Sequence, residues 1–379
     1  MKVLVYADFR SSHARGWLEG IRSAGIDALA VSSEYVRDYE VVNPTDWVST
    51  RRQGFLESEQ TRPPRGVGRF LRWASTRQVS HTAMSVARLP ARRRMLRAAI
   101  ADYGPDVIQA LRIPYEGLTI LGMRTSIPRV VSTWGSDFEP MASTDPALTA
   151  WMRARFRRID GFHTDSRTDL VRARKYGLAE SVPVLYSAAN FGVDESLFYY
   201  EPHRPSGVVV YPRKVKANAN YRGFIEAAVA LSASRSDLRF VAVGLKEIEA
   251  ELVQTYGADR LANIRFTGQL TRSEMSEVMR SAQVVVTPTY WDGTPLTILE
   301  AIACGAAVVA GELPELRALH DDGLPIDLIQ ASSTQAIVNG IVAALSRDDA
   351  AAIAKTLPPQ FDREANRTRA VEFYEKLLK

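Results

Sequence analysis

Two carboxylates, Asp292 and Glu300, lie eight positions apart around what the sequence predicts to be the start of a helix. A glycine and a proline break the chain after the apolar run Val284–Pro288, so this helix should begin near Leu296. The first N–H groups of a helix have no partner within it, and together with the helix dipole they favour an anion such as a diphosphate. Carboxylates repel a phosphate unless they accept hydrogen bonds from hydroxyls, and sugar and ribose hydroxyls are suitable donors. The pair therefore indicates a site for a phosphorylated, hydroxyl-rich ligand.

Cations follow a second apolar run, Val208–Tyr211, and precede the next predicted helix. They are Arg213, Lys214, Lys216 and Arg222. A departing diphosphate develops negative charge that guanidinium and ammonium groups can neutralise, so these residues could clamp the same ligand. A solvated loop is the alternative interpretation.

Two loops in the first half of the chain combine polar and small residues after a predicted strand. One contains Gly135 and Asp137, whose carboxyl could accept a hydrogen bond from an incoming hydroxyl or could cap a short helix. The other contains Arg10 and His13, which could touch a substrate or lie in a solvent-exposed cap.

Several other functional signatures are missing from the sequence. It contains no Asp-x-Asp pair, its five histidines lack metal-ligand spacing, and neither a Walker-type loop nor a Gly-x-Gly-x-x-Gly run follows a strand. Cys304 lies in an apolar helix and is interpreted as a small buried hydrophobe. We therefore predict neither a metal site nor a cofactor, and the pattern argues against a kinase, an NTPase and a nicotinamide enzyme.

Short apolar runs that alternate with helical stretches should form the scaffold for these loops. Such runs are typical of parallel sheets covered on both faces, and ligands bind beyond the carboxyl ends of their strands. The predicted strands are Lys2–Tyr6, Ala28–Val31, Asp106–Gln109, Arg129–Ser132, Gly161–Thr164, Val208–Tyr211, Arg239–Val243, Ile264–Thr267, Val284–Thr287, Ala307–Ala310 and Leu324–Leu328. The fold class is α/β, with two doubly wound halves. We expect an N-terminal domain at 1–189, a second domain at 190–358, and a final helix at 359–379 that packs back on the first.

The composition fits this organisation. A chain of 379 residues exceeds the size at which one core usually stops growing, and 46% hydrophobic with 24% charged residues is ordinary for a globular protein. The start of the chain is interpreted as a buried strand and not as a signal peptide, and no apolar window is long enough for a membrane span. With a single cysteine, the chain is expected in a reducing cytoplasm.

Positive charge is concentrated in residues 51–97, which hold twelve arginines against two acids. Interleaved apolar residues make parts of this segment amphipathic. An anionic membrane surface, a lipid diphosphate or an acidic glycan would suit such a face, which would place the protein at the inner membrane face. A solvated helical insertion is the alternative interpretation, and no nucleic-acid partner is expected.

The segment Asp292-Gly-Thr-Pro…Leu-Glu300-Ala-Ile-Ala-Cys-Gly305-Ala-Ala-Val-Val resembles the E-x7-E signature of retaining GT-B glycosyltransferases, especially glycosyltransferase family 4. Further pieces occur in the family's order and cover the C-terminal half of the chain. They are Asn190-Phe-Gly-Val-Asp194, Arg213 with the nearby lysines, Phe266-Thr-Gly268, Val286-Thr-Pro288 and Pro314-Glu315-Leu316. The first acid of the signature is Asp292 here, one methylene shorter, and Arg222 stands where the family often has lysine.

The resemblance implies a GT-B enzyme that moves a sugar from a nucleotide diphosphate sugar to a hydroxyl acceptor, lipid-linked or glycan, with retention and without a metal. Glu300 would hold ribose hydroxyls, Asp292 would hold donor-sugar hydroxyls, and Arg213 with Lys214 or Lys216 would stabilise the diphosphate. The remaining nucleotide-sugar contacts would come from Gly268, Thr294, Pro295, Leu296 and Arg222, and Asp137 would position groups. Two rivals are a nucleotide-sugar epimerase on the same scaffold and an inactive GT-B protein that binds an anionic surface.

Overall fold

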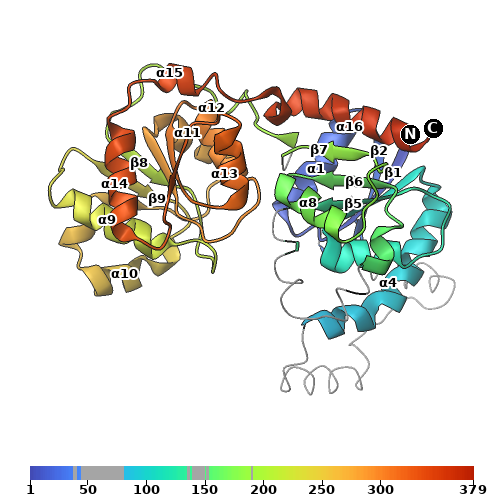
Figure 1. Ribbon diagram of the computed structural model, residues 1–379. Coiled ribbons are helices and arrows are strands. Elements are labelled where there is room, and N and C mark those ends of the chain that lie inside the picture. Colours follow the sequence, from blue (N-terminus) through green and yellow to red (C-terminus); the bar gives the residue numbers. More distant parts are fainter. Residues whose placement is uncertain (37–40, 44–80, 135–136, 139–149, 151–152, 189–190) are drawn as a thin grey trace.

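The computed structural model describes residues 1–36, 41–43, 81–134, 137–138, 150, 153–188 and 191–379. It contains two α/β domains that lie side by side, each built on a parallel sheet (Figure 1). Gly135 and most of the twelve arginines of segment 51–97 lie outside the described residues or have undescribed side chains.

The N-terminal sheet has the strand order β3-β2-β1-β4-β5-β6-β7, and its neighbouring strands are parallel. The strands are β1 (Lys2–Ala7), β2 (Asp27–Ser32), β3 (Val41–Val42), β4 (Val107–Leu111), β5 (Arg129–Thr133), β6 (Gly161–Thr164) and β7 (Val184–Tyr186). The described helices are α1 (Ser12–Ser23), α4 (His81–Tyr103), α5 (Leu118–Leu121), α8 (Arg167–Lys175) and a π-helical turn η1 (Ile113–Gly117).

The C-terminal sheet has the order β10-β9-β8-β11-β12-β13, the doubly wound order that reverses direction beside its first strand. Its strands are β8 (Val208–Tyr211), β9 (Arg239–Ala242), β10 (Ile264–Phe266), β11 (Val284–Thr287), β12 (Ala307–Gly311) and β13 (Ile326–Ile329). Its helices are α9 (Tyr221–Ser232), η3 (Lys246–Ile248), α10 (Glu249–Tyr256), η4 (Asp259–Leu261), α11 (Arg272–Ser281), α12 (Leu296–Ala303), α13 (Pro314–Asp321), α14 (Thr334–Leu345) and α15 (Ala350–Ile353).

The eleven predicted strands all occur, and the predicted helix start at Leu296 is confirmed. Central strands such as β8 and β11 are buried along their whole length because helices cover both faces of the sheet. The sequence did not predict β3 and β7, which are two and three residues long and lie at the edges of their sheet. Runs that short carry too little apolar pattern to be recognised.

The last helix, α16 (Arg363–Leu377), follows the turn η5 (Pro359–Phe361) and packs against α1 and β7 of the N-terminal domain (Figure 1). Phe373 and Tyr374 are buried in the core of that domain. The hydroxyl of Tyr374 donates a hydrogen bond to the side-chain oxygen of Gln109, which also accepts a bond of 2.9 Å from the indole of Trp17. The C-terminal end of the chain is therefore part of the N-terminal core.

The two segments that cross between the domains run together. Val193 on the outward crossing forms a β-bridge with Asp362 on the return, and the side chains of Asp194 and Arg363 form an ion pair. Gly192 has a φ of 114°, and a Cβ there would lie 2.1 Å from the carbonyl oxygen of Phe361. Glycine is needed at this position because the two backbones approach so closely.

Candidate active site

Loops at the carboxyl ends of β8 and β11 meet at the edge of the C-terminal sheet where ligands bind. The amide of Asn218 donates to the carbonyl of Trp291 at 2.8 Å, and the N–H of Tyr290 donates to the carbonyl of Asn218 at 2.8 Å. A β-bridge between Ala219 and Thr289 adds a third connection. These bonds hold the loop with the predicted cations against the loop with the first predicted carboxylate.

Arg213 and Asp292 form an ion pair across these two loops. Their side chains are 15% and 26% exposed, so the pair is largely shielded from water but can be reached from the surface. The second oxygen of Asp292 accepts a bond of 3.0 Å from the N–H of Gly293, which orients the carboxylate. A guanidinium held in this way is preorganised for an anion, and the carboxylate is available to hydroxyls beside it.

Lys216 lies close to other positive charges. With Arg112, Arg213 and Lys214 it forms what we call the cationic group. The pKa of Lys216 is lowered, mainly because burial removes water and further because of the charges of Lys214, Arg213 and Arg112, whereas Asp292 raises it. Arg112 belongs to the N-terminal domain, so cations from both domains surround this position. Mutual repulsion among cations makes binding of a polyanion there favourable.

The start of α12 borders this cationic group. Pro295 occupies the N-cap position, and because proline has no side-chain acceptor it leaves the first N–H groups of the helix available to another acceptor. Leu296 is the first helical residue and is buried. The hydroxyl of Thr294 donates towards the carbonyl of Asp165 in the N-terminal domain and towards Glu315. Gly268, after β10, is exposed, and a side chain there would meet open space.

Glu300, on the fifth position of α12, is 3% exposed and forms an ion pair of 3.1 Å with Arg272 at the start of α11. Burial raises the pKa of Glu300 to about 7, although Arg272 opposes this shift. The guanidinium of Arg272 lies 5.1 Å from the ring centre of Phe198. The predicted ribose-binding carboxylate is therefore buried and paired with a side chain that is 43% exposed.

Residues after three strands of the N-terminal domain, β1, β4 and β5, lie near the loops that carry Lys216 and Asp292. His13 and Trp134, after β1 and β5, have ring centres 5.8 Å apart. The pKa of His13 is lowered by loss of water and by Lys216, whereas Asp292 raises it, so the imidazole lies within electrostatic reach of the C-terminal loops. Arg112, after β4, has a φ of 84°, a strained value for a side-chain-bearing residue that is often found at functional sites.

Asp137 is fully buried and already bonded to the chain's own donors. One oxygen accepts from the guanidinium of Arg112 at 3.3 Å and from the N–H of Ile113 at 3.2 Å, and the other accepts from the N–H of Trp134 at 2.8 Å. The carboxyl thus ties the loop after β5 to the strained turn after β4. Its predicted contact with a substrate hydroxyl stays a prediction, and the geometry adds a structural role.

Asp137→Ala is expected to lower the free energy of unfolding by about 2–4 kcal/mol, because it leaves the buried N–H of Ile113 and the partly buried N–H of Trp134 without an acceptor. The matched control is Asp160→Ala, which also removes an acceptor for a backbone N–H and a guanidinium, both from Arg129, but at a side chain that is 43% exposed. The control should cost no more than about 1 kcal/mol. Denaturant unfolding measures both variants, and equal losses would contradict the structural role of Asp137.

Among the described residues, no hydrogen bond or ion pair joins Arg222 to Arg213, Lys214 or Lys216. It pairs with Glu251 of α10 at 2.7 Å, and its guanidinium lies 5.4 Å from the ring centre of Tyr221. Both partners in the ion pair are about half exposed, so the contact is a surface one. Lys216 is therefore a better candidate than Arg222 to complete the diphosphate clamp.

Arg272 and Arg112 lie beside predicted site residues, and the sequence did not predict either of them. A cation at the first position of a helix opposes the helix dipole, and Arg272 directly follows the N-cap residue Thr271. An arginine at this unfavourable helix position could have been noticed in the sequence as a candidate functional residue. For Arg112 the significance comes from its backbone conformation and its partners, which no short pattern reveals.

The described end of the arginine-rich segment, on α4, is partly used within the protein. Arg92 pairs with Glu34 at 3.0 Å, and Arg93 donates to the carbonyl of Thr119 at 3.2 Å, whereas Arg94 and Arg97 are exposed. Among the helices of the described residues, none has the length and apolar character needed to cross a membrane. The same part of the chain shows no group of three or more potential metal ligands of the His, Cys, Asp or Glu type.

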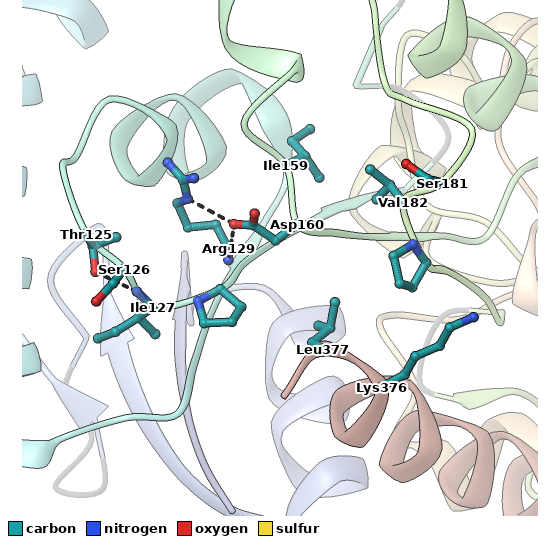
Figure 2. Close-up of a pocket in the computed structure, with 12 residues that line it drawn as sticks. Thr125, Ser126, Ile127, Arg129, Ile159, Asp160, Ser181, Val182, Lys376 and Leu377 are labelled. Atoms are coloured by element: carbon teal, nitrogen blue, oxygen red, sulfur yellow. Dashed lines mark hydrogen bonds and ion pairs between the residues drawn. The ribbon is translucent and has the colours of Figure 1, made fainter. Parts of the chain in front are cut away.

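A cavity of about 480 Å³ lies at the other edge of the N-terminal sheet, before β5, β6 and β7 and beside the end of α16 (Figure 2). Two of its three charged lining residues, Arg129 and Asp160, bond to each other, as the dashed lines in Figure 2 show, and the third is Lys376. Ligands of parallel sheets bind at the carboxyl ends of strands, and this cavity is at the amino ends. We therefore assign the chemistry to the loops described above.

Comparison with known proteins identifies similar sequences and similar folds. Residues 206–347 match the family model described as glycosyl transferases group 1. The phosphatidyl-myo-inositol mannosyltransferase of Mycobacterium tuberculosis is 24% identical over 291 residues, which cover 66% of this chain and 77% of the relative. Among solved structures, the sucrose-phosphate synthase of Thermosynechococcus elongatus has a TM-score of 0.67 at 16% identity and covers 100% of this chain and 99% of its own. The Anabaena protein HepE in complex with UDP has a TM-score of 0.68 at 15% identity, covering 99% of this chain and 100% of its own.

The two facing doubly wound domains and the helix that returns to the first define the GT-B fold, as the solved structures show. With the family match and the mannosyltransferase relative, the chain is a glycosyltransferase of the GT-B fold. Its C-terminal domain is the part similar to group 1 glycosyl transferases.

Proposed function

We propose that this glycosyltransferase takes its sugar from a nucleotide diphosphate sugar and transfers it to a hydroxyl acceptor with retention of anomeric configuration and without a metal. The observation that carries the proposal is the cationic group around Lys216, with Arg213 held by Asp292 and Arg112 contributed from the other domain. Such a group can neutralise a leaving diphosphate without the aid of a divalent ion.

Each carboxylate then has a defined partner. Glu300, buried one turn inside α12, accepts hydrogen bonds from ribose hydroxyls. Asp292, at the mouth of the site beside Arg213, accepts bonds from hydroxyls of the donor sugar. The N–H groups of Thr294 and Leu296 and the positive end of the α12 dipole face the diphosphate between them.

The transfer step needs no nucleophilic side chain. The bond between the anomeric carbon and the diphosphate oxygen breaks, and the acceptor oxygen bonds to the same face of that carbon. The acceptor hydroxyl gives its proton to the departing diphosphate oxygen, so charge and atoms balance. Arg213 and Lys216 stabilise the diphosphate as its negative charge increases.

One relative and the charge of the chain support a proposal for the acceptor. The mannosyltransferase relative is named for phosphatidyl-myo-inositol, a lipid with ring hydroxyls. Arg94 and Arg97 on α4 are exposed at the described end of an arginine-rich segment. We therefore infer a hydroxyl acceptor on a lipid or glycan, reached while residues 51–97 contact an anionic membrane surface. Failure of liposomes with anionic lipid to bind the protein at low salt would remove this membrane contact.

A thermal-shift panel of UDP, GDP, ADP and dTDP tests the donor site. One diphosphate should stabilise the protein by about 2.7 kcal/mol at a hundred times its Kd, which corresponds to a rise in Tm of a few degrees for a chain of this size. The matching nucleoside monophosphates are the control, because they lack the second phosphate for the clamp. A panel in which no diphosphate raises the Tm above its monophosphate would refute the proposed donor.

A further inference from the structure

One buried carboxylate, Glu315, joins the two domains. It lies in the first turn of α13 in the C-terminal domain and is 2% exposed. From the N-terminal domain it accepts hydrogen bonds from the hydroxyl of Ser166 at 2.8 Å and from the N–H groups of Arg167 at 3.2 Å and Thr168 at 3.1 Å. From its own domain it accepts one from the hydroxyl of Thr294 at 3.2 Å.

Ser166, Arg167 and Thr168 are the N-cap and the first two residues of α8, and the hydroxyl of Tyr186 at the end of β7 also donates to Glu315, at 3.5 Å. The first N–H groups of a helix lack partners inside it, and a carboxylate satisfies both their hydrogen bonds and the positive end of the helix dipole. Bonds from neutral donors to an ionised acceptor are the stronger kind, and burial from water increases their strength further. A carboxylate of one domain thus caps the first two N–H groups of a helix of the other, in addition to the helix's own N-cap residue Ser166.

The partner from its own domain connects Glu315 to the donor loop. Thr294 is 4% exposed and stands between Asp292 and the start of α12. Its hydroxyl also approaches the carbonyl oxygen of Asp165, which directly precedes the N-cap residue of α8. The loop proposed to hold the diphosphate is therefore held by the same contacts that hold α8.

On the other side, α8 is connected to the strand ends that face the donor. It follows β6, whose last residue Thr164 accepts a hydrogen bond of 2.8 Å from the hydroxyl of Thr133 at the end of β5. Trp134, the next residue, is the one that approaches His13. A shift of α8 would therefore move the part of the N-terminal domain that faces the donor.

We propose that Glu315 is a positioning residue for the transfer, which fixes the N-terminal domain relative to the Thr294 loop so that the acceptor meets the donor sugar. The inference rests on the proposed function, in which that loop holds the diphosphate. Glu315 touches neither the sugar nor the acceptor. It acts through α8 and Thr294, and misplacement of reacting groups by about 1 Å is enough to slow a reaction about a hundredfold.

The test uses the full-length chain with Glu315→Ala and Glu315→Gln. The control is Asp322→Ala, which removes an ion pair of 2.7 Å to Arg167 across the same two domains, but at side chains that are 32% and 49% exposed. UDP, GDP, ADP and dTDP are titrated to obtain the Kd of each variant. Turnover is the release of nucleoside diphosphate from the donor that the wild type uses, and it is normalised to the stoichiometry of nucleotide binding. Small-angle X-ray scattering reports the arrangement of the domains.

We expect Glu315→Ala to bind the nucleoside diphosphate within about threefold of the wild type, to turn over about a hundredfold more slowly per binding site, and to have a larger radius of gyration. Glu315→Gln keeps one acceptor oxygen, so its turnover and radius of gyration should lie between those of the wild type and Glu315→Ala. It replaces the alanine variant if that one does not fold. Asp322→Ala should match the wild type in all three measurements.

Two results would overturn the inference. Normal turnover in both Glu315 variants would show that the contact does not position the domains. A fall in nucleotide affinity that matches the fall in turnover would place Glu315 in the donor site itself. If the wild type binds none of the four diphosphates, the proposed function fails, and the scattering measurement still decides whether Glu315 holds the domains together.

Discussion

Arg213→Ala is expected to lower kcat by about a hundredfold or more, with a much smaller effect on stability. The guanidinium is 15% exposed and is paired with Asp292 at the place where the diphosphate should leave. Its removal takes away one preorganised positive charge and also leaves the carboxylate of Asp292 without its partner. Both changes disfavour the negative charge that develops on the leaving group, and loss of one such contact typically costs a hundredfold to a thousandfold in rate.

The measurement is steady-state turnover on the true donor and acceptor, with thermal unfolding to confirm that each variant is folded. Arg235→Ala is the matched control, because it removes an arginine that is also paired with an aspartate, Asp237, but on the exposed surface. It should leave turnover within about twofold of the wild type. An Arg213→Ala enzyme with normal turnover would exclude the clamp.

Glu300→Gln should raise the Kd for the nucleoside diphosphate by about ten- to a hundredfold. Hydrogen bonds to an ionised acceptor are worth about 1.5–3 kcal/mol each, and the amide retains only part of this. Glu300 is 3% exposed, so no nearby water can replace the lost acceptor. Isothermal titration calorimetry with the diphosphate selected by the thermal-shift panel measures the change.

The same residue predicts how binding depends on pH. Burial raises the pKa of Glu300 to about 7, so the carboxyl is mostly protonated at pH 6 and mostly ionised at pH 8. Ribose hydroxyls donate better to the ionised form, and the affinity of the wild type should therefore rise with pH through this range. The phosphates of the ligand also titrate there, and Glu300→Gln isolates their contribution. Identical pH profiles for the two proteins would show that Glu300 does not hold the ribose.

The sequence predicted the scaffold well because each central strand carries its own signal. Val208–Tyr211 and Val284–Thr287 are apolar throughout and are buried on both faces, so composition alone locates them. The position of the candidate site followed from topology, because the residues after parallel strands meet at one edge. Asp292 and Arg213 are 79 positions apart in the sequence and form an ion pair for this reason.

The contacts between side chains from different elements could not be predicted in the same way. Arg222 has the expected residue type and spacing, yet its partner is Glu251 on a neighbouring helix. Glu315 could be recognised as part of a family pattern, but its bonds to α8 depend on how two separately folded domains meet. Tertiary geometry decides such pairings, and local sequence carries little information about it.

The return of α16 to the first domain has a consequence for recombining enzymes of this fold. Phe373 and Tyr374 complete the core of the N-terminal domain, and the hydroxyl of Tyr374 shares Gln109 with Trp17. A hybrid that takes a donor half from another protein must therefore exchange an internal block and keep both ends of the chain from one parent. A hybrid with a single recombination point would combine the α16 of one parent with the N-terminal core of the other. Two recombination points, near Val193 and near Asp362, keep α16 and its core together.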